Sequence, residues 1–228
     1  MSSIRQIIIF LGAPGSGKGT LSRMCVDKLD WKQLSTGDLC RQHVQAGTEI
    51  GKEIDFTLKS GTLVRDSVII DMVAQWLATQ VQDADSVILD GFPRTVVQAR
   101  SFIAMMDGSF ENVTLKVYQL IVPDSEIVKR LSSRVVCSNK ECQAIYSERL
   151  LGSSEWHTKK CDVCGHSLVK RNDDTVEKIH ARLVNYHHHI EQLLEYYRNI
   201  GCQVIDINAD VPTEEIFQEI LYYERITQ

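Results

Sequence analysis

The sequence predicts an α/β protein in which helices cover both faces of a parallel sheet. Short apolar runs rich in Ile and Val alternate along the chain with helical patterns, and this alternation is typical of such a fold. The first apolar run leads directly into a glycine-rich loop, as in the first half of a β-α-β unit. The chain has 228 residues, of which 43% are hydrophobic. It can therefore build one sizeable core with small inserted subdomains.

Five strands are expected, because continuous apolar and β-branched runs are typical of strands buried on both faces. The expected strands cover Ile7–Leu11, Lys32–Leu34, Val87–Leu89, Lys116–Val122 and Gln203–Ile207. The helical patterns between them include a stretch that ends at Leu29, Asp66–Gln82 and Thr95–Met106.

Two segments interrupt this alternation, and we interpret both as insertions on one core. Residues 35–64 are polar and helical in pattern, with interspersed glycines that include Gly47 and Gly61. Residues 133–174 carry a cluster of cysteines and several turn signals. The predicted core domain therefore comprises residues 1–34, 65–132 and 175–228.

The composition narrows the class of function. The formal net charge is −5 at pH 7, whereas a general nucleic-acid binder usually has a basic excess, so we expect no nucleic-acid partner. The run Ile7–Leu11 is too short for a membrane span or a signal-peptide core. The seven cysteines are an odd number and argue against a disulfide framework. We expect a cytoplasmic monomer with no membrane partner.

The glycine-rich segment Gly12–Thr20 carries the strongest functional signal. It contains the phosphate-loop pattern G-x-x-x-x-G-K-[ST] in a variant register, with Gly19 where Ser or Thr is usual and Thr20 after it. Glycines let backbone N–H groups approach phosphate oxygens, and the following helix offers its positive N-terminal end to an anion. Lys18 adds a point charge for the β- and γ-phosphates. The strand before it and the helix after it favour a phosphate site over a simple glycine turn.

Further motifs occur in a characteristic order: GAPGSGKGT (Gly12–Thr20), STGDLCR (Ser35–Arg41), DGFPRT (Asp90–Thr95), RNDD (Arg171–Asp174) and RLVNY (Arg182–Tyr186). Together they resemble the adenylate kinases, of the long-lid type with a zinc-binding lid, over nearly the whole chain. The resemblance implies a P-loop three-layer fold with a five-stranded parallel sheet. It also implies a helical NMP-binding insert at 35–64 and a zinc-ribbon-like lid at 133–174.

The implied activity is the Mg²⁺-dependent, reversible transfer of the γ-phosphoryl group of ATP to AMP, giving two ADP. Such transfer needs positioning and charge neutralisation, and little covalent chemistry from the protein. Arginine suits this task, because its planar fork binds phosphate oxygens in pairs and stays protonated. An active site rich in arginine and lysine is therefore expected.

The resemblance assigns roles residue by residue. The implied catalytic residues are Lys18, Arg94, Arg134, Arg171 and Arg182. The implied ATP-binding residues are Gly15, Ser16, Gly17, Lys18, Gly19, Thr20, Arg130 and Arg134. The implied AMP-binding residues are Thr36, Arg41, Val64, Gly91, Arg94, Gln98, Arg171 and Arg182. Asp90 resembles the carboxylate that orients magnesium through water at the carboxyl edge of the sheet.

Within this resemblance, Arg41 and Arg94 would hold the AMP phosphate, with Thr36 and Gln98 beside its adenine. Arg130 would pack on the donor base. Thr95 and Gln98 favour AMP over UMP or CMP as the acceptor. UMP or CMP as acceptor and GTP as donor remain alternatives within the family. A non-catalytic nucleotide-binding regulator and a P-loop hydrolase that uses water remain alternatives outside it.

Four of the cysteines lie close together in sequence: Cys137, Cys142, Cys161 and Cys164. Short-spaced thiolate pairs can complete one tetrahedral ion, and four sulfur ligands make a structural site with no open position. The cluster resembles a zinc ribbon, although the family usually has two residues between the first pair and this chain has four. His157 and His166 are possible substitute ligands, Asp162 is a weaker one, and iron or cobalt could replace zinc.

The remaining cysteines and a run of histidines are given structural interpretations. Cys25, Cys40 and Cys202 lack partners at metal-binding spacing and are expected to be small core residues. His187–His189 lie in a helical pattern and are expected to form a solvated helix face.

Overall fold

A computed structural model describes residues 4–60, 64–80, 84–109, 113–139, 142, 144–152 and 156–226 of the chain. Its main sheet has five parallel strands in the order β2-β3-β1-β4-β8. These strands are β1 (Gln6–Gly12), β2 (Lys32–Ser35), β3 (Ser86–Asp90), β4 (Thr114–Ile121) and β8 (Gln203–Asn208). The predicted α/β class and all five predicted strands are confirmed, with boundaries that differ by one or two residues.

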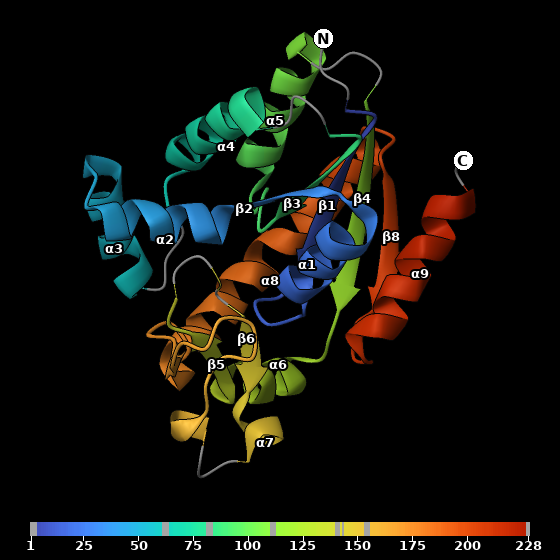
Figure 1. The fold of residues 1–228 in the computed structure, drawn as a ribbon. Helices are drawn as coiled ribbons and strands as arrows, with labels where there is room; N and C mark the ends of the chain where they lie inside the picture. Colours follow the sequence, from blue (N-terminus) through green and yellow to red (C-terminus); the bar gives the residue numbers. More distant parts are fainter. Residues whose placement is uncertain are drawn as a thin grey trace.

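Helices cover both faces of this sheet (Figure 1). They are α1 (Lys18–Leu29), α4 (Asp66–Gln80), α5 (Val96–Ser109), α6 (Asp124–Ser132), α8 (Val176–Asn199) and α9 (Thr213–Ile226). The predicted helix Asp66–Gln82 corresponds to α4, and its last two residues lie outside the described part of the chain. The described helices include none that is long and apolar enough to cross a lipid bilayer.

Alternate residues of β1 pack into two separate cores, as the side-chain period of a strand requires. Ile7 and Ile9 face a core built with residues of α4, α5 and the C-terminal half of α8. Ile8 and Phe10 face a second core built with α1, α6, α9 and the N-terminal half of α8. Both faces of β1 are thus fully buried, which explains why its sequence is continuously apolar.

The segment between β2 and α4 forms two helices, α2 (Thr36–Ala46) and α3 (Glu49–Ser60). The Ser35 side chain caps α2 by accepting a hydrogen bond from the Asp38 backbone N–H at 3.2 Å. The two helices cross closely at Gly51, where a Cβ atom would lie 2.0 Å from the His43 carbonyl oxygen. A glycine is therefore required for this crossing.

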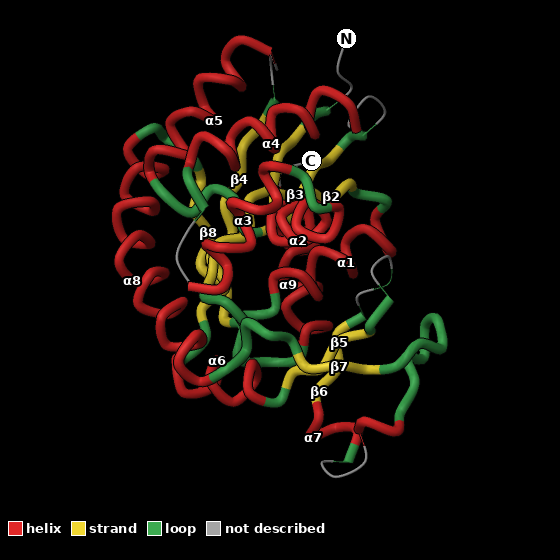
Figure 2. The backbone as a smooth tube through the Cα atoms, turned by 90° about the vertical axis from the view of Figure 1, so that its left-hand side faces the viewer, coloured by secondary structure: helices red, strands yellow, loops and turns green. Residues whose placement is uncertain are grey.

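The cysteine-containing segment forms a small antiparallel sheet in the order β6-β5-β7, which stands apart from the main sheet in Figure 2. Its elements are β5 (Arg134–Cys137), β6 (Ile145–Ser147), the short helix α7 (Glu148–Leu151), a 3-10 turn at Trp156–Thr158 and β7 (Leu168–Lys170). β5 pairs with β7 so that Val135 lies opposite Lys170 and Cys137 opposite Leu168.

Candidate active site

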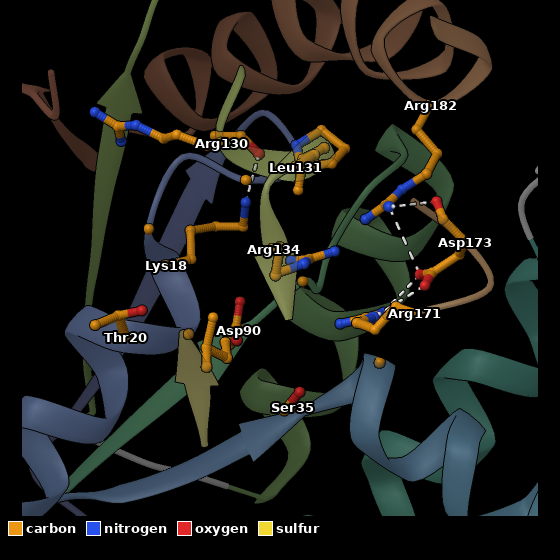
Figure 3. A pocket seen from close by; sticks show the side chains of 18 of the residues that line it. Lys18, Thr20, Ser35, Asp90, Arg130, Leu131, Arg134, Arg171, Asp173 and Arg182 are labelled. Atoms are coloured by element: carbon orange, nitrogen blue, oxygen red, sulfur yellow. Dashed lines mark hydrogen bonds and ion pairs between the residues drawn. The ribbon is translucent and has the colours of Figure 1, made fainter. Parts of the chain in front are cut away.

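A cavity of about 1050 Å³ opens at the carboxyl ends of the main-sheet strands, between α2, α8 and the small sheet. This edge is where ligands of open α/β sheets usually bind. The sequence-predicted residues that line the cavity are Gly15, Gly17, Lys18, Gly19, Thr20, Thr36, Arg41, Val64, Asp90, Gly91, Arg94, Gln98, Arg130, Arg134, Cys137, Arg171 and Arg182. Ser16 does not belong to the lining and is fully buried, with 0% of its surface exposed. Figure 3 shows the charged side chains gathered around this space.

The loop between β1 and α1 is shaped by its glycines. Gly15 has a φ angle of +86°, and a Cβ there would lie 2.8 Å from two carbon atoms of Leu131 on α6. Gly12 has a φ of +153°, and a Cβ there would lie 2.8 Å from the Leu120 carbonyl oxygen. Side chains at either position would push the loop away from its supports. The helix α1 begins at Lys18 with no side-chain cap, so its first N–H groups are available to an anion.

Lys18 folds back over this loop. Its ammonium group donates to the carbonyl oxygens of Gly12 at 2.7 Å and Ala13 at 2.9 Å, and to Ser16 Oγ at 3.3 Å. Burial lowers the Lys18 pKa to about 8; the Asp90 carboxylate opposes this shift, and nearby arginines add to it. Burial also raises the pKa of Asp90, against the effect of Lys18 and Arg94. An anionic ligand placed here would favour the charged form of Lys18.

A second group of side chains lies around the turn after β3. Thr36 Oγ1 donates to the Gly91 carbonyl oxygen at 2.9 Å, and Arg94 Nε donates to the same oxygen at 2.8 Å. A Cβ at Gly91 would lie 3.0 Å from both Thr36 Oγ1 and Arg94 Nη2. Arg41, one helical turn after Asp38, forms an ion pair with it. These contacts hold two guanidinium groups at one end of the cavity.

Three further arginines form a network with two aspartates at the root of the small sheet. Arg134 donates to both carboxylate oxygens of Asp174, at 2.7 and 2.6 Å. Arg171 likewise donates to both oxygens of Asp173, at 2.9 and 2.5 Å. Arg182 donates to Asp174 Oδ1 and to the Asp173 carbonyl oxygen, each at 3.2 Å. Figure 3 shows Arg134 between Lys18 on one side and the Arg171–Asp173–Arg182 group on the other.

The charges in this network alter one another's ionisation. Burial opposes ionisation of Asp173, yet Arg171, Arg182 and Arg134 hold its pKa well below its usual range. Burial lowers the pKa of Arg182 to about 10, and the Asp173 carboxylate opposes that shift. The cluster therefore has more positive groups than its two carboxylates neutralise, and it can accept additional negative charge.

Arg130 lies at the opposite rim, on the last turn of α6. Its guanidinium donates to the Ala209 carbonyl oxygen and to Asp210 Oδ1, both at 3.0 Å. These contacts lock the side chain against the loop after β8, with a planar group beside the cavity.

The four clustered cysteines converge at the far end of the small sheet. Their Sγ atoms all lie within 4.8 Å of one another, with Cys137 to Cys164 at 3.3 Å and Cys142 to Cys161 at 3.6 Å. A tetrahedral ion with sulfur bonds of about 2.3 Å would separate its ligands by about 3.8 Å. The spacing and the all-thiol donor set therefore fit a structural metal site. Within the described residues, this four-sulfur group includes neither His157 nor His166, nor Asp162.

The other sequence interpretations are only partly confirmed. Cys25 and Cys40 are buried, whereas Cys202 is only half-buried. His187 and His188 are exposed, and His187 pairs with Asp124 at 2.9 Å. The prediction of a solvated face is wrong for His189, which is half-buried and lines the cavity. Its position three residues after Tyr186, another lining residue, places both on one helix face.

Sequence reasoning missed the role of the two aspartates in the arginine network. Asp173 and Asp174 are part of the RNDD motif, but only the arginine of that motif received a role. The sequence did contain a signal for this role, because two consecutive acidic residues lie between the motif arginines Arg171 and Arg182.

Comparison with known proteins gives consistent matches. A family model described as "Adenylate kinase" matches residues 10–202. The "Adenylate kinase" of Methanothrix thermoacetophila is 37% identical over 213 residues, covering 93% of this chain and 95% of the relative. That of Chlamydia trachomatis serovar D is 37% identical over 226 residues, covering 94% and 88%. That of Thermosipho africanus is 34% identical over 214 residues, covering 94% and 97%.

Proposed function

The chain belongs to the adenylate kinase family and is a nucleoside monophosphate kinase, and from this premise we propose which side chains serve each substrate. The reaction joins two polyanions, ATP and AMP, and yields two ADP. One observation supports the assignment most directly: Lys18 and the six arginines predicted for the site, which come from distant parts of the chain, line one cavity. Its volume of about 1050 Å³ is at the upper end for a site that holds one ligand, which is consistent with two nucleotides.

We assign the donor to the P-loop side. The backbone N–H groups of residues 15–20 bind the ATP phosphates, together with the Lys18 ammonium group. Lys18 already turns its ammonium toward the loop, where carbonyl oxygens hold it in place. Arg130 provides a flat, fixed guanidinium on which the donor base stacks.

We assign the acceptor to the α2 side. Arg41 and Arg94 bind the AMP phosphate as bidentate donors. Thr36, Val64, Gly91 and Gln98 surround the remainder of the nucleotide. Val64 is buried, with 8% of its surface exposed, and so is Gln98, with 2%.

The transferring phosphoryl group lies between these ends, where Arg134, Arg171 and Arg182 converge. Each of these arginines has an aspartate partner in the structure, and phosphate oxygens offer the same bidentate geometry as a carboxylate. We infer that the substrate phosphates share or displace these partners. The arginines stabilise the charge that spreads over the phosphoryl oxygens during transfer.

Adenylate kinases use Mg²⁺ with ATP, and Asp90 is positioned for it. Its carboxylate lies 3.4 Å from where a side chain at Gly19 would begin and close enough to Lys18 to affect its pKa. When bound, the ion neutralises phosphate charge. We propose that Asp90 orients it through water molecules.

We propose that Cys137, Cys142, Cys161 and Cys164 hold one structural Zn²⁺. A segment this short has little core of its own: the described cluster contains Val135, Ala144, Leu168 and two of the cysteines. Bound metal supplies the folding free energy that such a small unit lacks. A monomeric state and a cytoplasmic location remain predictions.

The direct test is a coupled assay of ADP formation with panels of donors and acceptors. ATP with AMP is expected to be the best pair, and Lys18→Ala and Arg94→Ala are each expected to reduce turnover strongly. ATP hydrolysis that does not depend on AMP, or the absence of ADP from ATP and AMP, would overturn the proposal.

A further inference from the structure

The amide group of Gln98 is held from both ends. Its Oε1 accepts a hydrogen bond from the Arg94 backbone N–H at 2.7 Å. Its Nε2 donates to Asp66 Oδ1 at 2.8 Å. A backbone N–H can only donate and a carboxylate can only accept. These two partners therefore fix which end of the amide is nitrogen and which is oxygen.

Asp66 is itself held in place by a neighbour of Gln98. Its second oxygen, Oδ2, accepts a hydrogen bond from Thr95 Oγ1 at 3.0 Å. The same hydroxyl oxygen accepts one from the Gln98 backbone N–H at 3.1 Å. Asp66 begins α4, whereas Gln98 lies in the first turn of α5 and Thr95 directly precedes that helix. A carboxylate from a separate helix thus acts together with the Arg94 backbone N–H to set the orientation of a side chain that lines the cavity.

Among the described residues, the amide bonds only to Arg94 and Asp66, which leaves one N–H and one lone pair of its oxygen available to a ligand. The Watson–Crick edge of adenine presents a 6-amino donor beside the N1 acceptor. Hypoxanthine presents a 6-oxo acceptor beside an N1–H donor. Each edge matches a glutamine amide in one orientation only. The two orientations differ by exchange of the amide oxygen and nitrogen. A site that fixes the amide can therefore discriminate between the two bases, because the wrong edge leaves buried polar groups unpaired.

We propose that Asp66 is a positioning residue that sets acceptor-base selectivity by locking the Gln98 amide in the orientation that accepts a 6-amino purine. The inference depends on the proposed function, in which Gln98 lies beside the base of AMP. It assigns the discrimination against 6-oxo purines such as IMP to a residue whose own contacts are with Gln98 and Thr95.

The test is Asp66→Asn, which keeps the size of the side chain but allows either end of it to face Gln98. Losing a hydrogen bond to a charged partner typically weakens an interaction by about tenfold or more. We therefore expect kcat/KM for AMP to fall by about tenfold, with a much smaller change for IMP. The AMP-to-IMP ratio of kcat/KM should fall by about the same factor, while the KM for ATP stays unchanged.

Asp71→Asn is the matched control, because Asp71 lies on the same helix and is exposed. It is expected to leave the ratio unchanged. Thr95→Val provides a second variant should Asp66→Asn fold poorly, since it frees the other carboxylate oxygen. It is expected to lower the ratio by a smaller factor than Asp66→Asn does, because the hydrogen bond between Asp66 and Gln98 remains.

The outcomes are distinguishable. A wild-type ratio in folded Asp66→Asn, or equal losses for AMP and IMP, overturns the inference, because a purely structural role would reduce both substrates alike. If the wild-type enzyme itself makes no ADP from AMP, the proposed function fails instead.

Discussion

The guanidinium of Arg134 and the carboxylate of Asp174 form a two-point ion pair at 2.7 and 2.6 Å, with only 12% and 4% of their side chains exposed. A buried charge that loses its partner is costly. Asp174 therefore stabilises, in the free enzyme, the same Arg134 guanidinium that we propose to bind the substrate phosphates.

Asp174→Asn is expected to destabilise the free protein by about 3 kcal/mol, because it removes the carboxylate that accepts both hydrogen bonds of the buried Arg134 guanidinium. Saturation with a bisubstrate nucleotide analogue should recover part of this loss, since phosphate can take the place of the carboxylate. Denaturant unfolding with and without the analogue measures both values. Asp27→Asn, at an exposed position of α1, is expected to cost less than about 0.5 kcal/mol. An equal loss of unfolding free energy with and without the analogue would contradict the idea that phosphate replaces the Asp174 carboxylate as the partner of Arg134.

Lys18→Ala is expected to lower kcat by about a hundredfold to a thousandfold, the range observed when one preorganised donor is removed from a transition state. Lys18→Arg should retain more of the wild-type kcat than Lys18→Ala, but not all of it. The bulkier guanidinium cannot make the short contacts to the Gly12 and Ala13 carbonyl oxygens. Steady-state kinetics measure both. An unaltered kcat in Lys18→Ala would exclude a role in the transition state.

The activity is expected to fall as the pH rises through about 8, the value to which burial lowers the Lys18 pKa in the free enzyme. Deprotonation removes the positive charge that binds phosphate, so kcat/KM for ATP decreases on the alkaline side. The pH dependence of kcat should decline at a higher pH, because bound nucleotide favours the protonated lysine. Lys18→Arg should show no such decline between pH 7 and 9. A wild-type profile that is flat through this range would exclude Lys18 as the titrating group.

Metal analysis is expected to find about one zinc ion per chain, and Cys142→Ser should largely lose it. The variant should become sensitive to protease within residues 133–174 while the main sheet remains folded. Cys202→Ser is the matched control, since Cys202 lies outside the cluster and its thiol contacts the Leu115 carbonyl oxygen. Full metal content in Cys142→Ser, with protease resistance retained, would show that Cys142 is not a ligand.

The fold could be predicted well because strands that are buried on both faces are continuously apolar in sequence. The strands at residues 7–11 and 87–89 are continuously apolar since Ile8 and Ile9 face two different cores. Strand and helix ends were less accurate, because caps and neighbouring strands determine them. The helix expected to begin at Thr95 begins at Val96, while Thr95 instead accepts a hydrogen bond from the Gln98 N–H.

The candidate site was predictable only where a motif identifies a single residue. The arginines could be named from the sequence, but their partners could not. Nothing local shows that Asp174 pairs with Arg134, which lies 40 positions away, or that Asp66 orients Gln98 from another helix. His189 was misjudged for the same reason: a run of histidines looks solvated until the fold turns one of them toward the cavity.

The strand β5 carries Arg134 at one end and Cys137 at the other, and its pairing with β7 places Arg134 beside Arg171 at the open end of the ladder. Because side chains alternate along a strand, a slip by a single residue would turn one guanidinium away from the other. The four-cysteine group lies at the opposite end of this ladder, and we expect a metal ion bound there to hold the register of β5 against β7. By holding that register, the bound ion would keep both positive groups facing the same way.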